Sequence, residues 1–168
     1  MHRLARIARH RWHDERQVRR VLGDAALARL QQRLTASEAH HSGEIRVCIE
    51  AGLPLADLWR HATPRQRAVA LFGELGVWDT EANNGVLIYL LLAERAIEIV
   101  ADRAVARLVP PSHWIDLVQG MRAAFGEGRF EDGLASAIAA VDAVLRQHFA
   151  LARGQSNPNE LPDRIDLR

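Results

Sequence analysis

The chain has 168 residues, of which 48% are hydrophobic and 26% are charged, and these values are typical of one globular domain with its own core. Its formal net charge of +1 argues against a dedicated nucleic-acid-binding protein, because that class needs many uncompensated basic residues. All 22 basic residues are arginines, so the absence of lysine excludes a lysine Schiff base and a P-loop lysine.

Cys48 is the only cysteine, which excludes an internal disulfide and a cysteine-based zinc site. The longest apolar run, residues 85–93, has about half of the roughly 20 residues that a membrane-spanning helix needs. Residues 1–20 are basic and have no apolar segment of the kind found in signal peptides. We therefore expect a cytoplasmic location and no transmembrane segment.

The first part of the chain is predicted to be helical. Residues 1–13 form a basic N-terminal arm, which we expect to be frayed or to extend the helix that follows. From Asp14 to His40, apolar residues recur at steps of three and four, which predicts an amphipathic helix. Gly23-Asp24 is a candidate break in it, with Asp24 capping a second segment.

Three strands are predicted in the middle of the chain. Residues 44–51 alternate, with Ile45, Val47 and Ile49 on one face. Residues 85–92 and 96–101 are separated by three residues, a spacing that predicts an antiparallel hairpin. Between the first strand and this hairpin, a capping-box sequence predicts the start of a helix that ends near Gly76, at Thr63-Pro64-Arg65-Gln66.

Two further helices are predicted after the hairpin, one beginning at Pro110-Pro111-Ser112 and one after Gly133. Strand 85–92 is apolar on both faces, so helices should cover both sides of the sheet. The expected fold is α/β: a three-layer α/β/α sandwich in which helices flank a small mixed sheet on both faces. We predict one domain over residues 14–150 and a disordered polar tail over 151–168.

The candidate site lies where oxygen-rich loops adjoin these strands. An acidic and amide-rich loop, residues 79–85, runs into strand 85–92, and the next strand ends at a carboxylate. Hard cations such as Ca²⁺ and Mg²⁺ prefer such oxygen ligands. The proposed ligands are Asp79, Glu81, Asn83, Asn84 and Asp102. A purely structural turn is the alternative, because Asp and Asn bond their own backbone and Asn84-Gly85 suits a positive φ.

Five blocks of the chain, in this order, resemble the TPM-domain family, which takes its name from a thylakoid-lumen protein, a photosystem-repair protein and a nematode receptor modulator. The most specific block is Asn83-Asn84-Gly85 followed by an apolar strand. The five blocks are Gly43–Glu50, Leu75–Asp79, Asn83–Leu90, Ile97–Asp102 and Gly128–Gly133. The resemblance implies an α/β/α sandwich with an acidic pocket at the strand ends. Some members are described as acid phosphatases, some bind calcium, and others serve in photosystem maintenance or receptor modulation.

The sequence leaves three functions open. The first is a non-catalytic interaction module that binds a divalent cation and recruits a protein partner, with no nucleic acid involved. The second is a metal-dependent phosphomonoesterase similar to an acid phosphatase, in which Arg103 holds the phosphate. The third is a scaffold with a vestigial pocket. The sequence departs from the family where a glycine-rich strand end is replaced by Val100-Ala101-Asp102-Arg103.

Overall fold

A mixed sheet forms the centre of the molecule. The computed structural model describes residues 2–11, 15–152, 154–157 and 159–168. Within them, four strands pair in the order β3-β2-β1-β4. The strands are β1 (Ile45–Glu50), β2 (Val86–Leu91), β3 (Ala96–Ala101) and β4 (Asp166–Leu167). β1 pairs in parallel with β2 and with β4, and β2 and β3 form the predicted antiparallel hairpin.

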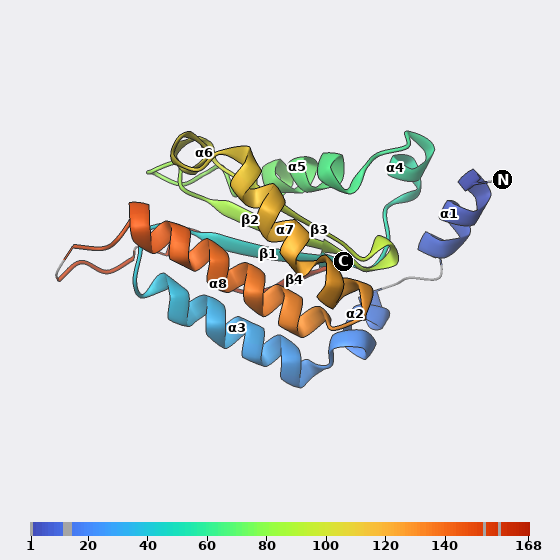
Figure 1. Ribbon diagram of the computed structural model, residues 1–168, viewed down its shortest axis with the longest axis horizontal. Helices are drawn as coiled ribbons and strands as arrows, with labels where there is room; N and C mark the ends of the chain where they lie inside the picture. The colour runs from blue at the N-terminus through green and yellow to red at the C-terminus, as the bar shows by residue number, and fades with distance from the viewer. Residues whose placement is uncertain (1, 12–14, 153, 158) are drawn as a thin grey trace.

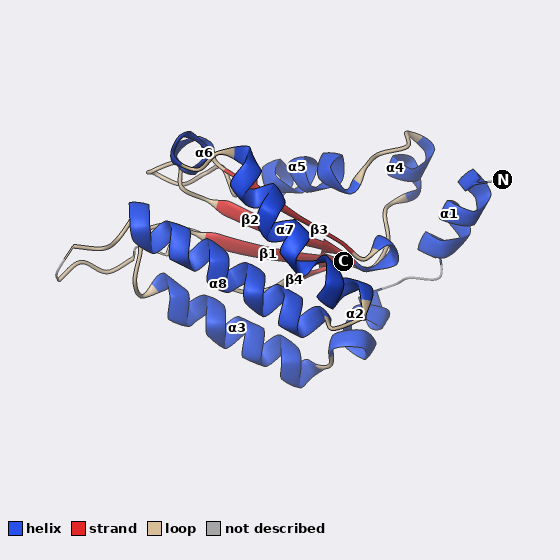
Figure 2. Cartoon of the chain, viewed as in Figure 1, coloured by secondary structure: helices blue, strands red, loops and turns tan. Residues whose placement is uncertain are grey.

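Helices pack on both faces of this sheet (Figure 1). The α-helices in the described residues are α1 (His2–Arg11), α2 (Glu15–Leu22), α3 (Asp24–Glu38), α4 (Leu55–Trp59), α5 (Pro64–Glu74), α6 (Arg103–Leu108), α7 (Pro111–Gly126) and α8 (Phe130–His148). One face of the sheet is covered by α3, α7 and α8 and the other by α5, and Figure 2 shows the strands enclosed between helices. The predicted helix-flanked α/β fold is confirmed. In the described part of the chain, no helix is long and apolar enough to cross a membrane.

Alternating side chains along the strands divide the core into two parts. In β2, Ile88 and Leu90 pack on the side of α7 and α8, whereas Leu87 and Tyr89 pack on the side of α5. Every residue of β1 and β2 is buried, as strands covered on both faces require. The face assignment predicted for β1 is also confirmed, because Ile45, Val47 and Ile49 all lie in the part of the core on the side of α7 and α8.

Local sequence signals determine where the helices begin. The Thr63 side chain accepts a hydrogen bond from the Gln66 N–H, and the Gln66 side chain accepts one from the Thr63 N–H, so α5 starts with the predicted capping box. Gly23, at φ +78°, separates α2 from α3 at the predicted break. The predicted capping role of Asp24 is wrong: Gly23 is the N-cap, and Asp24 accepts an ion-pair hydrogen bond from Arg19 at 2.9 Å.

The N-terminal segment is a separate helix that packs against the domain. Its His10 is 3% exposed, and the His10 Nδ1 accepts a hydrogen bond of 2.9 Å from the Leu53 N–H. Its Arg6 binds the Glu94 carboxylate at 2.7 Å. The described residues of this arm are therefore neither frayed nor a continuation of α2. The polar contacts of His10 and Arg6 with distant segments hold α1 in place.

The C-terminal residues are the largest departure from expectation. Arg46 in β1 donates hydrogen bonds to two C-terminal carbonyl groups, including that of Arg164 at 3.0 Å. The buried Glu44 carboxylate accepts a bond of 3.3 Å from the Leu161 N–H. The prediction of a disordered tail over residues 151–168 is therefore wrong where β4 forms. Side chains of β1 and its flank satisfy the backbone of this polar segment, whose own sequence predicts no structure.

Candidate functional site

The two stretches that were predicted to form a site meet at one end of the sheet. The Asp102 N–H donates a bond of 2.9 Å to the Gly85 carbonyl, and the Ala104 N–H donates one of 3.0 Å to the Asn83 carbonyl. These bonds form because β2 begins where the antiparallel β3 ends. The site therefore lies at the amino ends of the parallel strands β1 and β2, opposite the carboxyl ends where α/β proteins commonly bind ligands.

Asn84 and Asp102 each carry a buried oxygen that has no hydrogen-bond partner among the residues that the structure describes. Asn84 is fully buried, and its amide nitrogen donates a bond of 3.0 Å to the Ser42 carbonyl, but its Oδ1 is unpaired. Asp102 is 6% exposed; its Oδ1 accepts a bond of 2.7 Å from the Arg103 N–H as the N-cap of α6, and its Oδ2 is unpaired. An unsatisfied buried oxygen costs about 1–3 kcal/mol. These two atoms are therefore suited to a cation or a donor ligand.

The other predicted ligands lie differently. Asp79 and Glu81 are exposed on the loop between α5 and β2. Asn83 adopts φ +51°, and its Oδ1 accepts a hydrogen bond of 2.9 Å from Arg103. A positive φ therefore occurs in this loop, although at Asn83 and not at Asn84-Gly85. In the described ranges, no group of three or more His, Cys, Asp or Glu side chains is arranged to hold a metal ion.

Arg103, the residue predicted to hold a phosphate, lies at the surface. Its side chain is 78% exposed, and its Nε lies 3.9 Å from the Asp102 Oδ1. The guanidinium group is engaged by the Asn83 side chain. Arg103 therefore lies beside Asp102, its neighbour in the chain, and Asn83 orients its side chain.

A buried ionic network at the opposite end of β1 was not predicted. The Arg67 guanidinium donates hydrogen bonds of 2.7 to 3.2 Å to both oxygens of Glu50. The Tyr89 hydroxyl donates a bond of 2.6 Å to the same carboxylate. Burial, together with the negative charge of Glu50, raises the pKa of Tyr89. The sequence did contain a signal for this network. Glu50 is a charged residue in a strand that is covered on both faces, so it has to be buried.

A second group of carboxyl side chains lies beneath the C-terminal segment. Glu38, near the end of α3, is 5% exposed, and the neighbouring Glu44 is fully buried. Burial, followed by the negative charges of Asp163 and Glu44, raises the pKa of Glu38 from its ordinary value of 4.5 to about 8. Nothing in the sequence indicated this group, because Asp163 comes from the part of the chain predicted to be disordered.

The raised pKa of Glu38 predicts that the protein loses stability as the pH rises toward 8. Between pH 4.5 and 8 the folded state holds a proton on Glu38 that the unfolded state has released. The free energy of unfolding should therefore fall by about 1.4 kcal/mol per pH unit in this window, from this group alone. Glu38→Gln should remove that slope and make the protein more stable than the wild type at pH 8. Urea unfolding at pH 6, 7 and 8 measures the slope.

The control for this experiment is Glu127→Gln, because the Glu127 side chain is 62% exposed. This variant should keep the pH slope of the wild type. A Glu38→Gln variant that keeps the same slope would contradict the assignment of the buried proton to Glu38.

Comparison with known proteins agrees with this architecture. The family model of the TPM domain matches residues 17–144. Among solved structures, the BA42 protein of the psychrophilic bacterium Bizionia argentinensis is 25% identical, with a TM-score of 0.71 over 84% of this chain and 92% of that protein. The N-terminal domain of a P. gingivalis protein is 23% identical, with a TM-score of 0.59 over 79% and 83% of the two chains. No curated protein matches the sequence. Since the family model covers most of its length, the chain belongs to the TPM-domain family.

Proposed function

We propose that this TPM domain is a non-catalytic interaction module that binds a divalent cation, Ca²⁺ or Mg²⁺, at Asn84 and Asp102. The observation that supports it is the pair of buried, unpaired oxygens, Asn84 Oδ1 and Asp102 Oδ2. They lie on segments joined by the hydrogen bond from the Asp102 N–H to the Gly85 carbonyl. Hard cations favour this carboxylate and amide chemistry, so a cation is the ligand suited to these two atoms.

The remaining ligands would come from water and from the exposed carboxylates of the same loop. Asp79 and Glu81 belong to that loop. Because only one carboxylate of the site is buried, we expect a dissociation constant on the order of 10⁻⁴–10⁻³ M, typical of weak calcium modules. The nearby positive charge of Arg103 should weaken binding, so Arg103→Gln is expected to tighten it.

Thermal unfolding of EDTA-treated protein, with and without Ca²⁺, Mg²⁺ or Mn²⁺, tests the cation site. A site occupied at about 100 times its dissociation constant should add about 2.7 kcal/mol to the free energy of unfolding. Asp102→Asn should abolish the increase, because asparagine still caps α6 but lacks the charge. The matched control is Asp132→Asn, whose side chain is 67% exposed at the start of another helix.

Two results would contradict the proposal. If none of the three ions raises the free energy of unfolding, the cation site is excluded. Steady turnover of p-nitrophenyl phosphate that disappears in Asp102→Asn would instead show a phosphatase, and the module would then be catalytic.

A further inference from the structure

The outer edge of β3 presents backbone groups to which no strand of the described residues is paired. The Asp102 N–H points to β2, so the alternation of an antiparallel ladder turns the N–H and C=O groups of Ile97 and Ile99 outward. The Ile99 carbonyl accepts a hydrogen bond from the Arg65 guanidinium. Within the described residues, this is the only hydrogen bond to the outward groups of Ile97 and Ile99. The edge therefore has unused capacity for pairing.

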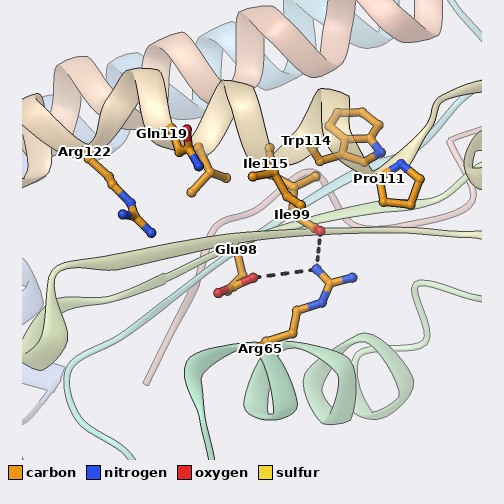
Figure 3. A pocket seen from close by; sticks show the side chains of 9 residues that line it. Arg65, Glu98, Ile99, Pro111, Trp114, Ile115, Gln119 and Arg122 are labelled. Carbon is orange, nitrogen blue, oxygen red and sulfur yellow. Dashed lines mark hydrogen bonds and ion pairs between the residues drawn. The ribbon is translucent and has the colours of Figure 1, made fainter.

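A groove follows this edge. Two cavities of about 420 and 390 Å³ lie along β3 and share Glu98, Val118 and Arg122 in their linings, so they are adjacent. In Figure 3, α7 forms one wall, and Arg65 reaches up from α5 on the other side. We call this feature the β3 groove. Its volume falls in the range of ligand-binding clefts, and its length follows the strand.

The two sides of the β3 groove differ in chemistry. The wall formed by α7 is apolar around Ile115, which is 54% exposed, and carries Gln119 and Arg122 farther along the helix. On the α5 side, the Arg65 Nη1 lies 3.7 Å from the Glu98 carboxylate, and the Arg65 side chain is 52% exposed. Arg122 also lines the groove beside Glu98. Three arginines line the whole groove (Arg65, Arg95 and Arg122) against two glutamates (Glu94 and Glu98), which leaves one positive charge uncompensated, so the groove favours an acidic ligand.

We propose that the β3 groove binds an extended segment of a partner protein as an added strand, with apolar and acidic residues in alternation. The segment's backbone would pair with Ile97 and Ile99. Because side chains alternate along a strand, its apolar residues would face Ile115, and its acidic residues would meet Arg65. The Arg65 guanidinium would release the Ile99 carbonyl and bind a carboxylate of the segment instead. That hydrogen bond is charge-assisted and therefore stronger.

The strand-pairing proposal is independent of the cation site and is tested in EDTA on the full ¹⁵N-labelled chain. The probe is a capped eight-residue peptide, (Val-Asp)₄. It should cause saturable shifts of the Ile97 and Ile99 amide signals. At about ten times its dissociation constant, it should slow hydrogen exchange at both amides about tenfold. The capped peptide (Val-Lys)₄ should bind at least about tenfold more weakly, because the groove carries excess positive charge.

Two protein variants distinguish peptide binding in the groove from binding elsewhere on the surface. Ile115→Asp places a charge in the apolar wall and should weaken binding of (Val-Asp)₄ at least about tenfold. Leu108→Asp is the matched control, since Leu108 is 51% exposed on α6 and does not line the groove. It should bind the peptide as the wild type does. Both sites are exposed, so both variants should fold, and circular dichroism checks this.

Strand pairing also requires the peptide's own N–H groups. A (Val-Asp)₄ peptide that is N-methylated at alternate residues, in either register, should lose binding. The proposal is overturned if (Val-Asp)₄ shows no saturable binding, if both methylated peptides bind as well as the parent, or if Ile115→Asp has no larger effect than Leu108→Asp. In each of these cases Arg65 would only protect an exposed edge from aggregation.

Discussion

Arg67→Met is expected to lower the free energy of unfolding by about 3–5 kcal/mol, because it leaves a buried carboxylate without its counter-charge. The Glu50 side chain is 4% exposed, and Arg67 is 12% exposed. Arg67 approaches both Glu50 oxygens, with the shortest hydrogen bond at 2.7 Å. Tyr89 supplies another bond at 2.6 Å, but a neutral hydroxyl does not compensate the charge. Urea unfolding at pH 7 measures the loss.

The double variant Glu50→Gln/Arg67→Met distinguishes an unpaired charge from lost packing. It removes both charges and should therefore recover much of the stability lost in the single variant. If the double variant is as unstable as Arg67→Met, the loss comes from the packing of the arginine side chain. A single-variant loss below about 1 kcal/mol would mean that the pair behaves as an exposed salt bridge.

Gly85→Ala should be still more damaging, with an expected loss of at least about 4 kcal/mol. A Cβ atom at Gly85 would lie 2.1 Å from the Val77 carbonyl oxygen and 3.0 Å from the Val77 Cγ1. Neither backbone can move easily, because Val77 is fully buried and the Gly85 carbonyl binds the Asp102 N–H. The backbone shift that this clash requires should also move the Asn84 segment away from Asp102. Thermal and urea unfolding measure the effect.

Gly120→Ala is the matched control. Among the described residues, apart from its two chain neighbours and its own helix backbone, no atom lies within 4 Å of a Cβ at this position in α7. Alanine there should stabilise the protein by about 0.5–1 kcal/mol, because glycine is a poor helix former. Equal effects of the two substitutions would show that β2 can shift to accept the additional methyl group.

The predictions that the structure confirms rest on signals that span only a few residues. Alternation along residues 44–51 predicted both the strand and its two faces, since successive side chains of a strand point to opposite sides. The sequence Thr63-Pro64-Arg65-Gln66 predicted the start of α5 because each bond of a capping box joins neighbours in the chain. In both cases the physical cause lies within the segment itself.

The candidate site itself stays a prediction. The segments that carry Asn84 and Asp102 come together because each adjoins a buried strand of a recognisable hairpin, as the bond from the Asp102 N–H to the Gly85 carbonyl shows. Asp79 and Glu81 were grouped with them only by composition and loop position. Their exposure depends on the path of the loop across the surface, which no local rule determines. The same holds for the contact of Arg103 with Asn83.

By itself, the sequence determined the fold class, the family and most helices and strands of the domain. Only the tertiary structure decided that β4 completes the sheet, that Glu38 lies among other carboxyl groups, and that the β3 edge faces a groove. The reason is physical: Arg46 satisfies carbonyl groups more than 100 residues away, at Pro162 and Arg164. Hydrophobic periodicity records how a segment is buried, but it does not record which distant polar groups will satisfy its backbone.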